Sequence, residues 1–152
     1  MEAENTIIEK TAYLFGCRHD DQSFDADDSY EHSDAADQLI ETFGWNIVFP
    51  YWFQYLREQC QTPEDVLNFA NLFFYYGGTD YPMRDPYPFV SYLYYRVDTK
   101  QYGADATDIL DSIAIPLLSH IGDISLESNP DYVPENDPRI QKSIADWKNK
   151  TP

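Results

Sequence analysis

Two cysteines and three histidines are the residues of this chain best suited to act as nucleophiles, general bases or metal ligands. Cys17, His19 and His32 need one more donor to hold zinc, and the spacing Cys-x-His followed by a distant His matches no zinc finger. Cys60 as a nucleophile needs a base such as His120 beside it, yet Cys60 falls on the apolar side of an expected helix. We therefore expect both thiols to be reduced and buried, and we predict no catalytic residue, metal or cofactor.

Other familiar site patterns fail on their own spacing. The segment 25–31 offers oxygen ligands at alternate positions, but an EF-hand counted from Asp25 needs glycine and glutamate where this chain has Tyr30 and Ala36. The glycine pair at 77–78 lacks the lysine and hydroxyl residue of a phosphate-binding loop. A carboxylate pair for glycoside chemistry is inevitable among 27 acidic residues, so it carries no weight. An enzyme with a site assembled from scattered residues stays an alternative.

Negative charge is the strongest feature of the sequence. The chain has 27 Asp and Glu against 10 Lys and Arg, which gives a formal net charge of −17. Nucleic-acid binding depends mainly on Lys and Arg that neutralise phosphates, so a polyanion is repelled. Anionic membrane surfaces are disfavoured for the same reason. We therefore expect no direct nucleic-acid partner and no membrane partner.

Seventeen of the acidic residues fall in two windows, 19–56 and 101–138, that contain no Lys or Arg. Uncompensated like charge destabilises a compact chain. A chain that concentrates it in this way can use the field, because a negative surface speeds encounter with a basic partner and rejects acidic ones. Spaced carboxylates also resemble the phosphates of a nucleic-acid strand. The alternative is an acidic surface that serves solubility alone.

The segment 77–88 is a second candidate for recognition, because it combines tyrosines and charged residues with three prolines and two glycines. Proline reduces the entropy lost when a loop becomes ordered, and tyrosine supplies adaptable contact area. The composition fits a pre-organised protein-binding loop. It also fits a rigid connector whose rings pack on neighbouring helices.

Apolar residues recur at helical spacing through most of the chain. The clearest helix start is Thr62-Pro63-Glu64-Asp65, with a capping hydroxyl, a proline at the first position and two carboxylates at the positive end of the helix dipole. Pro116 should kink or split its helix. Residues 17–32 are expected to form a loop. The pattern predicts helices over 4–15, 33–43, 50–60, 62–75, 88–97, 105–121 and from 138 onward.

These segments predict an all-α fold of about seven helices in antiparallel pairs, a helical bundle. An apolar run leaves room for one short strand near residues 46–49. The length suits a single acidic helical domain over residues 1–152. With 43% hydrophobic and 16% aromatic residues the chain is not expected to be disordered.

The location expected from the sequence is the cytoplasm. The first residues have no basic region followed by an apolar run, so no signal peptide is visible. No stretch approaches the roughly 18 uncharged apolar residues of a membrane span.

The sequence therefore predicts a non-enzymatic, acidic protein-binding inhibitor, an immunity-type protein or a mimic of nucleic acid. Its partner is expected to be a basic protein such as a nuclease toxin or a nucleic-acid-binding effector. The alternative is a non-catalytic adaptor or complex subunit that binds through the segment 77–88. The residues expected to contact the partner are Asp20, Asp21, Asp25, Asp27, Asp28, Glu31, Asp80, Tyr81, Arg84, Asp85 and Tyr87.

Overall fold

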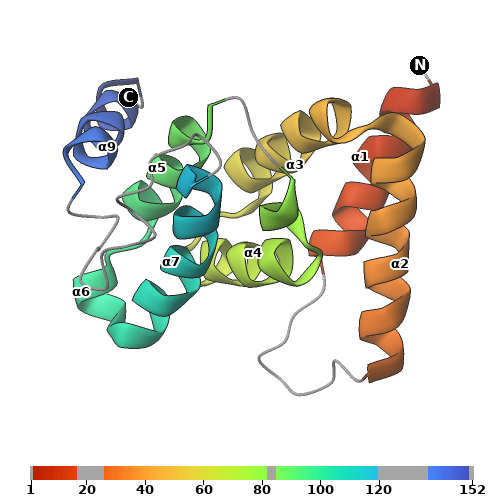
Figure 1. Ribbon diagram of the computed structural model, residues 1–152, viewed down its shortest axis with the longest axis horizontal. Coiled ribbons are helices and arrows are strands. Elements are labelled where there is room, and N and C mark those ends of the chain that lie inside the picture. The colour runs from red at the N-terminus through yellow and green to blue at the C-terminus, as the bar shows by residue number, and fades with distance from the viewer. Residues whose placement is uncertain (1, 17–25, 82–84, 120–136, 151–152) are drawn as a thin grey trace. The chain divides into compact units, whose positions relative to one another are not determined.

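A computed structural model describes the chain over residues 2–16, 26–81, 85–119 and 137–150 (Figure 1). These ranges contain helices and no β-strand, which confirms the predicted all-α class. None of the described helices is long and apolar enough to cross a membrane. The contacts group the chain into two compact units, Met1–Tyr76 and Gly77–Pro152. The single domain expected from the length stays a prediction, because such a unit can be half of one domain.

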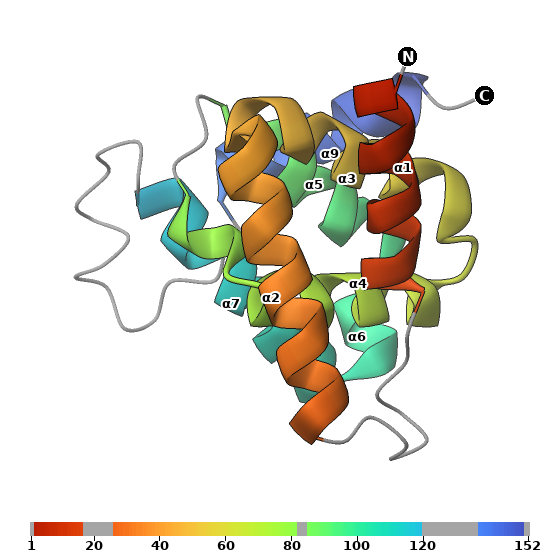
Figure 2. The same ribbon diagram turned by 90° about the vertical axis from the view of Figure 1, so that its right-hand side faces the viewer.

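The first unit is built from α1 (Glu2–Phe15), α2 (Ala26–Phe43), α3 (Trp45–Gln59) and α4 (Pro63–Tyr75). Helix α1 packs against the other three, and α2 also packs against α3. The two views in Figure 1 and Figure 2 show α1 and α2 side by side. Aromatic rings fill the interior: Phe15 stacks on Phe69 with centroids 4.2 Å apart and meets Trp52 edge-on at 5.0 Å.

The start of α4 is the one that the sequence predicts. The Thr62 hydroxyl accepts a hydrogen bond from the Asp65 backbone N–H at 3.1 Å, and the Asp65 carboxylate accepts one from the Thr62 N–H at 3.4 Å. This reciprocal capping box satisfies two backbone donors at the end of the helix. Just past the other end of α4, the Tyr76 hydroxyl donates to the Leu14 carbonyl and ties this end to α1.

The short strand expected near residues 46–49 is wrong, because these residues lie in the first turns of α3. Gly44 separates α2 from α3 with a positive φ of 90°, and its carbonyl accepts from the N–H groups of residues 47 and 48. Trp45, Val48 and Trp52 are all buried, and their spacing of three and four residues is that of one helix face. The apolar run thus belongs to a helical stripe that begins before it.

The loop expected over residues 17–32 is wrong from Ala26 onward, since α2 begins there and not at Ser33. The segment 26–31 has no apolar periodicity of its own. Acidic residue types at positions 27 and 28 nevertheless suit a first helical turn, where the helix dipole is positive.

The second unit contains the short 3-10 helix η1 (Gly78–Asp80) and the helices α5 (Tyr87–Arg96), α6 (Thr99–Tyr102), α7 (Ala104–Ser119) and α9 (Pro138–Lys150). Helix α5 packs against α7 and α9, and α7 also contacts α6 and η1. Pro116 lies inside α7 without splitting it. Helix α6 was not predicted, and it occupies only four residues.

Candidate functional site

An acidic face runs along α2, opposite the side that packs on the unit. Asp34, Asp37 and Glu41 are exposed, and they follow one another at three and four residues, so they lie along one side of the helix. Leu39 and Ile40 are buried on the other side. We call these three exposed carboxylates the acidic face of α2.

The stability of α2 does not explain these carboxylates. None of the three makes a hydrogen bond or an ion pair with another described residue. Asp37 lies three residues after Asp34 and four before Glu41, spacings at which like charges repel across a helix surface. Glu41 also stands in the last turn, where the helix dipole is negative and where α2 has no basic residue. These carboxylates therefore lower the stability of α2 and do not raise it.

The first unit holds most of the excess charge of the whole chain. Residues 1–76 contain 15 Asp and Glu and three Lys and Arg, a formal charge of −12 out of −17. The two described bases of this unit, Lys10 and Arg57, pair with none of the acidic face of α2. The electrostatic field of this unit is therefore negative. Among the described residues, the acidic face of α2 is where we place the candidate site.

The predicted contacts of the first window fall partly within α2. Asp20, Asp21 and Asp25 lie outside the described residues. Residues 27, 28 and 31 belong to the first turns of α2. Asp34, Asp37 and Glu41 themselves belong to the expected acidic window, although the predicted contact set did not include them.

The predicted contacts in the segment 77–88 belong to the second unit, and Arg84 lies outside the described residues. Asp80 is exposed at the end of η1, and its backbone N–H donates to the Gly77 carbonyl at 2.9 Å. Gly77 has a φ of 78°, which a residue with a side chain rarely adopts. Thr79 is buried and Tyr81 is half-buried. This part of the segment is anchored against the unit.

Asp85 and Tyr87 have structural contacts at the start of α5. The Asp85 carboxylate accepts a hydrogen bond from the Tyr87 backbone N–H at 3.3 Å. The guanidinium of Arg139 in α9 lies 5.5 Å from the centre of the Tyr87 ring, and it forms an ion pair with the buried Asp137 at 2.8 Å. These contacts favour the rigid connector over the binding loop for this end of the segment.

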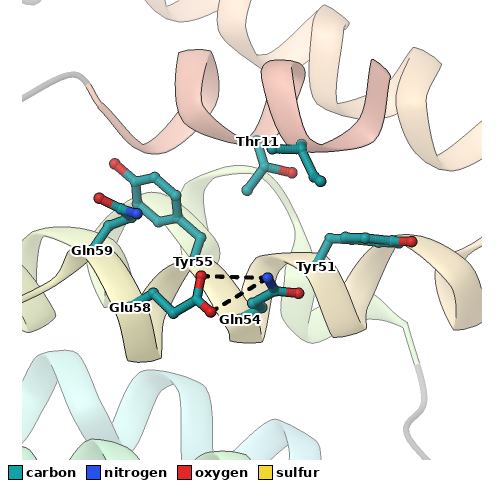
Figure 3. Close-up of a pocket in the computed structure, with 7 residues that line it drawn as sticks. Thr11, Tyr51, Gln54, Tyr55, Glu58 and Gln59 are labelled. Atoms are coloured by element: carbon teal, nitrogen blue, oxygen red, sulfur yellow. Dashed lines mark hydrogen bonds between the residues drawn. The ribbon is translucent and has the colours of Figure 1, made fainter. Parts of the chain in front are cut away.

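A groove that the sequence did not indicate lies between α1 and α3 of the first unit (Figure 3). It is shallow, with a volume of about 60 Å³, and it is open to solvent. Its walls are formed by Ile8 and Thr11 of α1 and by Tyr51, Gln54, Tyr55 and Glu58 of α3. Rings, amides and one carboxylate thus meet at a single concave site.

The candidate nucleophiles and metal ligands do not gather in the described part of the chain. Cys60 is 5% exposed, as expected for a buried thiol. His32 belongs to α2 and stacks on Tyr13 with ring centroids 4.4 Å apart. Cys17, His19 and His120 lie outside the described residues. Among the residues that are described, no group of three His, Cys, Asp or Glu is placed to hold a metal ion.

Comparison with known proteins gives no family for this chain. No protein-family model matches it. Neither the curated proteins nor the solved structures contain a match. What the chain does must therefore follow from its own charge and geometry.

Proposed function

We propose that this chain is an acidic inhibitor that binds a basic protein, in the manner of an immunity protein or a nucleic-acid mimic. The partner is a protein with a cationic site, such as a nuclease toxin or a nucleic-acid-binding effector. The observation that carries this proposal is the acidic face of α2, where Asp34, Asp37 and Glu41 are exposed without a counter-ion among the described residues.

The physical basis is the match between carboxylates and a site built for phosphates. Asp34 and Glu41 are seven residues apart on one helix, or roughly 10 Å along its axis. A rigid helix therefore presents anionic oxygens in a fixed row, and Lys or Arg side chains that hold phosphates can bind carboxylates by the same charge-assisted hydrogen bonds. The negative field of the first unit adds long-range attraction, which raises the association rate with a basic protein.

The alternative, an adaptor that binds through the segment 77–88, has less support. Asp80 is exposed there and open to a partner. Asp85 and Tyr87, in contrast, make contacts within the second unit. The experiment below therefore distinguishes the inhibitor from the adaptor.

Capture from the native cell extract at low salt tests the proposal with two charge-matched variants. In one, the acidic face of α2 is neutralised by Asp34→Asn, Asp37→Asn and Glu41→Gln. In the control, three exposed carboxylates of α1 are neutralised by Glu2→Gln, Glu4→Gln and Glu9→Gln. Circular dichroism establishes that both variants are folded.

The wild-type chain and the α1 control are expected to retain one basic protein, and the α2 variant is expected to lose it. Equal retention by both variants would contradict a role for the acidic face of α2. Loss of the captured protein only with Tyr81→Ala and Tyr87→Ala would establish the adaptor instead.

A further inference from the structure

Helix α2 is held in the first unit by few buried side chains. Among those that the structure describes, only Ala36, Leu39 and Ile40 are buried, and all three lie in the second half of the helix. In its earlier part, His32 stacks on Tyr13 of α1 with ring centroids 4.4 Å apart. Helix α4, in contrast, has 13 residues against 18 in α2 and buries five of them. Because segments with few buried apolar contacts open most easily in a folded protein, α2 is the helix of this unit best suited to open locally.

The composition of α2 also opposes a stable helix. Its sequence contains six Asp and Glu and no Lys or Arg, and four of the six are Asp, which is a weak helix former. Any two charged side chains of α2 therefore have the same sign at neutral pH. Among the described ones, Asp34 and Asp37 are three residues apart and Asp37 and Glu41 are four apart, spacings at which like charges destabilise a helix. Neutralising or screening these charges should therefore strengthen α2.

The junction between α2 and α3 lets α2 open while α3 keeps its own start. Gly44 alone separates the two helices, with a φ of 90° that favours glycine. Its carbonyl accepts hydrogen bonds from the N–H groups of residues 47 and 48, at 3.1 and 3.0 Å. The first turn of α3 is thus completed by Gly44 and not by α2. The buried Trp45 and Val48 then anchor this turn in the interior.

We propose that α2 is a charge-controlled helix, which opens locally while its carboxylates repel one another and becomes ordered when salt or a cationic protein neutralises them. The link to a partner rests on the proposed function, whereas the response to salt does not. The formal charge of −12 on the first unit gathers cations around α2. A basic protein that binds only the ordered helix stabilises it by mass action. Such a partner therefore orders the surface to which it binds.

Amide hydrogen exchange of the full chain, followed by mass spectrometry at constant pH, tests this proposal without the natural partner. Exchange is measured in 10 and 500 mM sodium chloride, between which the screening length falls from roughly 30 to 4 Å. Peptides from α2 report on its opening, and peptides from α3 and α4 of the same unit serve as internal references. Sucrose at the osmolality of the high-salt sample separates charge screening from a general stabilisation of the fold.

Exchange in α2 is expected to slow roughly tenfold from low to high salt, and by a larger factor than exchange in α3 and α4. Sucrose should slow exchange in all three helices by similar factors. The variant with a neutralised acidic face of α2 should exchange slowly in α2 already at low salt, whereas the α1 control should keep the salt response. A peptide of ten lysines at fixed ionic strength should act on α2 as salt does, and a neutral glycine–serine peptide of the same length should not.

Exchange in α2 that ignores salt, or that changes by the same factor as in α3 and α4, would overturn the charge-controlled helix. The same salt response in the wild-type chain and in the α2 variant would overturn it too. A captured basic protein together with a salt-insensitive α2 would leave the proposed function intact. A salt-sensitive α2 without a captured basic protein supports the charge-controlled helix and contradicts the inhibitor, so the two proposals fail separately.

Discussion

At the scale of single residues, the tyrosines divide between interior and surface. Tyr76 is 2% exposed and its hydroxyl donates to the Leu14 carbonyl, while its neighbour Tyr75 is 37% exposed. Tyr92 and Tyr94 are also buried, and the Tyr94 hydroxyl donates to the carboxylate of Asp111. Several of the tyrosines are therefore part of the interior and are not available to a recognition surface. The composition alone does not distinguish these buried tyrosines from exposed ones.

The buried Tyr76 and the exposed Tyr13 give a matched test of this division. Tyr76→Phe removes a buried hydrogen bond between α4 and α1, and it should lower the free energy of unfolding by about 1–2 kcal/mol. Tyr13→Phe removes a hydroxyl from a ring of α1 that is 46% exposed, and it should change the free energy of unfolding by less than about 0.5 kcal/mol. Urea denaturation followed by circular dichroism measures both, and equal effects would show that the hydroxyl of Tyr76 does not hold the two helices together.

At the scale of elements, the sequence predicts a helix start where the signal is local. Thr62 and Asp65 form the capping box that their spacing predicts, since a cap needs only residues within one turn. The starts of α2 and α3 were misplaced for different reasons. For α2, the segment 26–31 has no apolar residues at helical spacing, so the sequence gives no sign of a helix before Ser33. For α3, the consecutive apolar residues 47–49 look like a strand, although the buried residues Trp45, Val48 and Trp52 have helical spacing.

The groove between α1 and α3 was beyond sequence reasoning for a further reason. Ile8 and Thr11 are more than 40 positions from Gln54 and Glu58, and which helices pack together decides whether they meet. Periodicity identifies the face of each helix but not its neighbour. The acidic face of α2 is easier to predict from the sequence, because its three carboxylates lie within one helix and one charged window.

Helix α2 should show a trade-off between stability and binding at its last turn. Glu41→Lys replaces a repulsion with Asp37 by an attraction at a spacing of four residues, and it places a cation at the negative end of the helix dipole. The free energy of unfolding should rise by about 0.5–1 kcal/mol, while binding of the basic partner weakens. Urea denaturation measures the first effect and retention of the captured protein measures the second. A loss of stability would mean that Glu41 makes a favourable contact in the fold.

At the scale of the whole molecule, the charge is unevenly divided between the two compact units. The first unit has a formal charge of −12 and the second −5, although each contains half of the chain. Repulsion among these like charges opposes folding of the first unit. The packing of the unit therefore does not explain why the sequence keeps so many acidic residues. Attraction of a cationic protein is the reason that we propose.

The most direct test of this claim is the association rate constant of the captured partner as a function of ionic strength. Between about 10 and 150 mM salt the screening length falls from roughly 30 to 8 Å. We predict that the rate constant falls at least roughly tenfold over this range, and that neutralising the acidic face of α2 flattens the dependence. A rate constant that stays the same across the range, for both the wild-type chain and the α2 variant, would contradict electrostatic recognition.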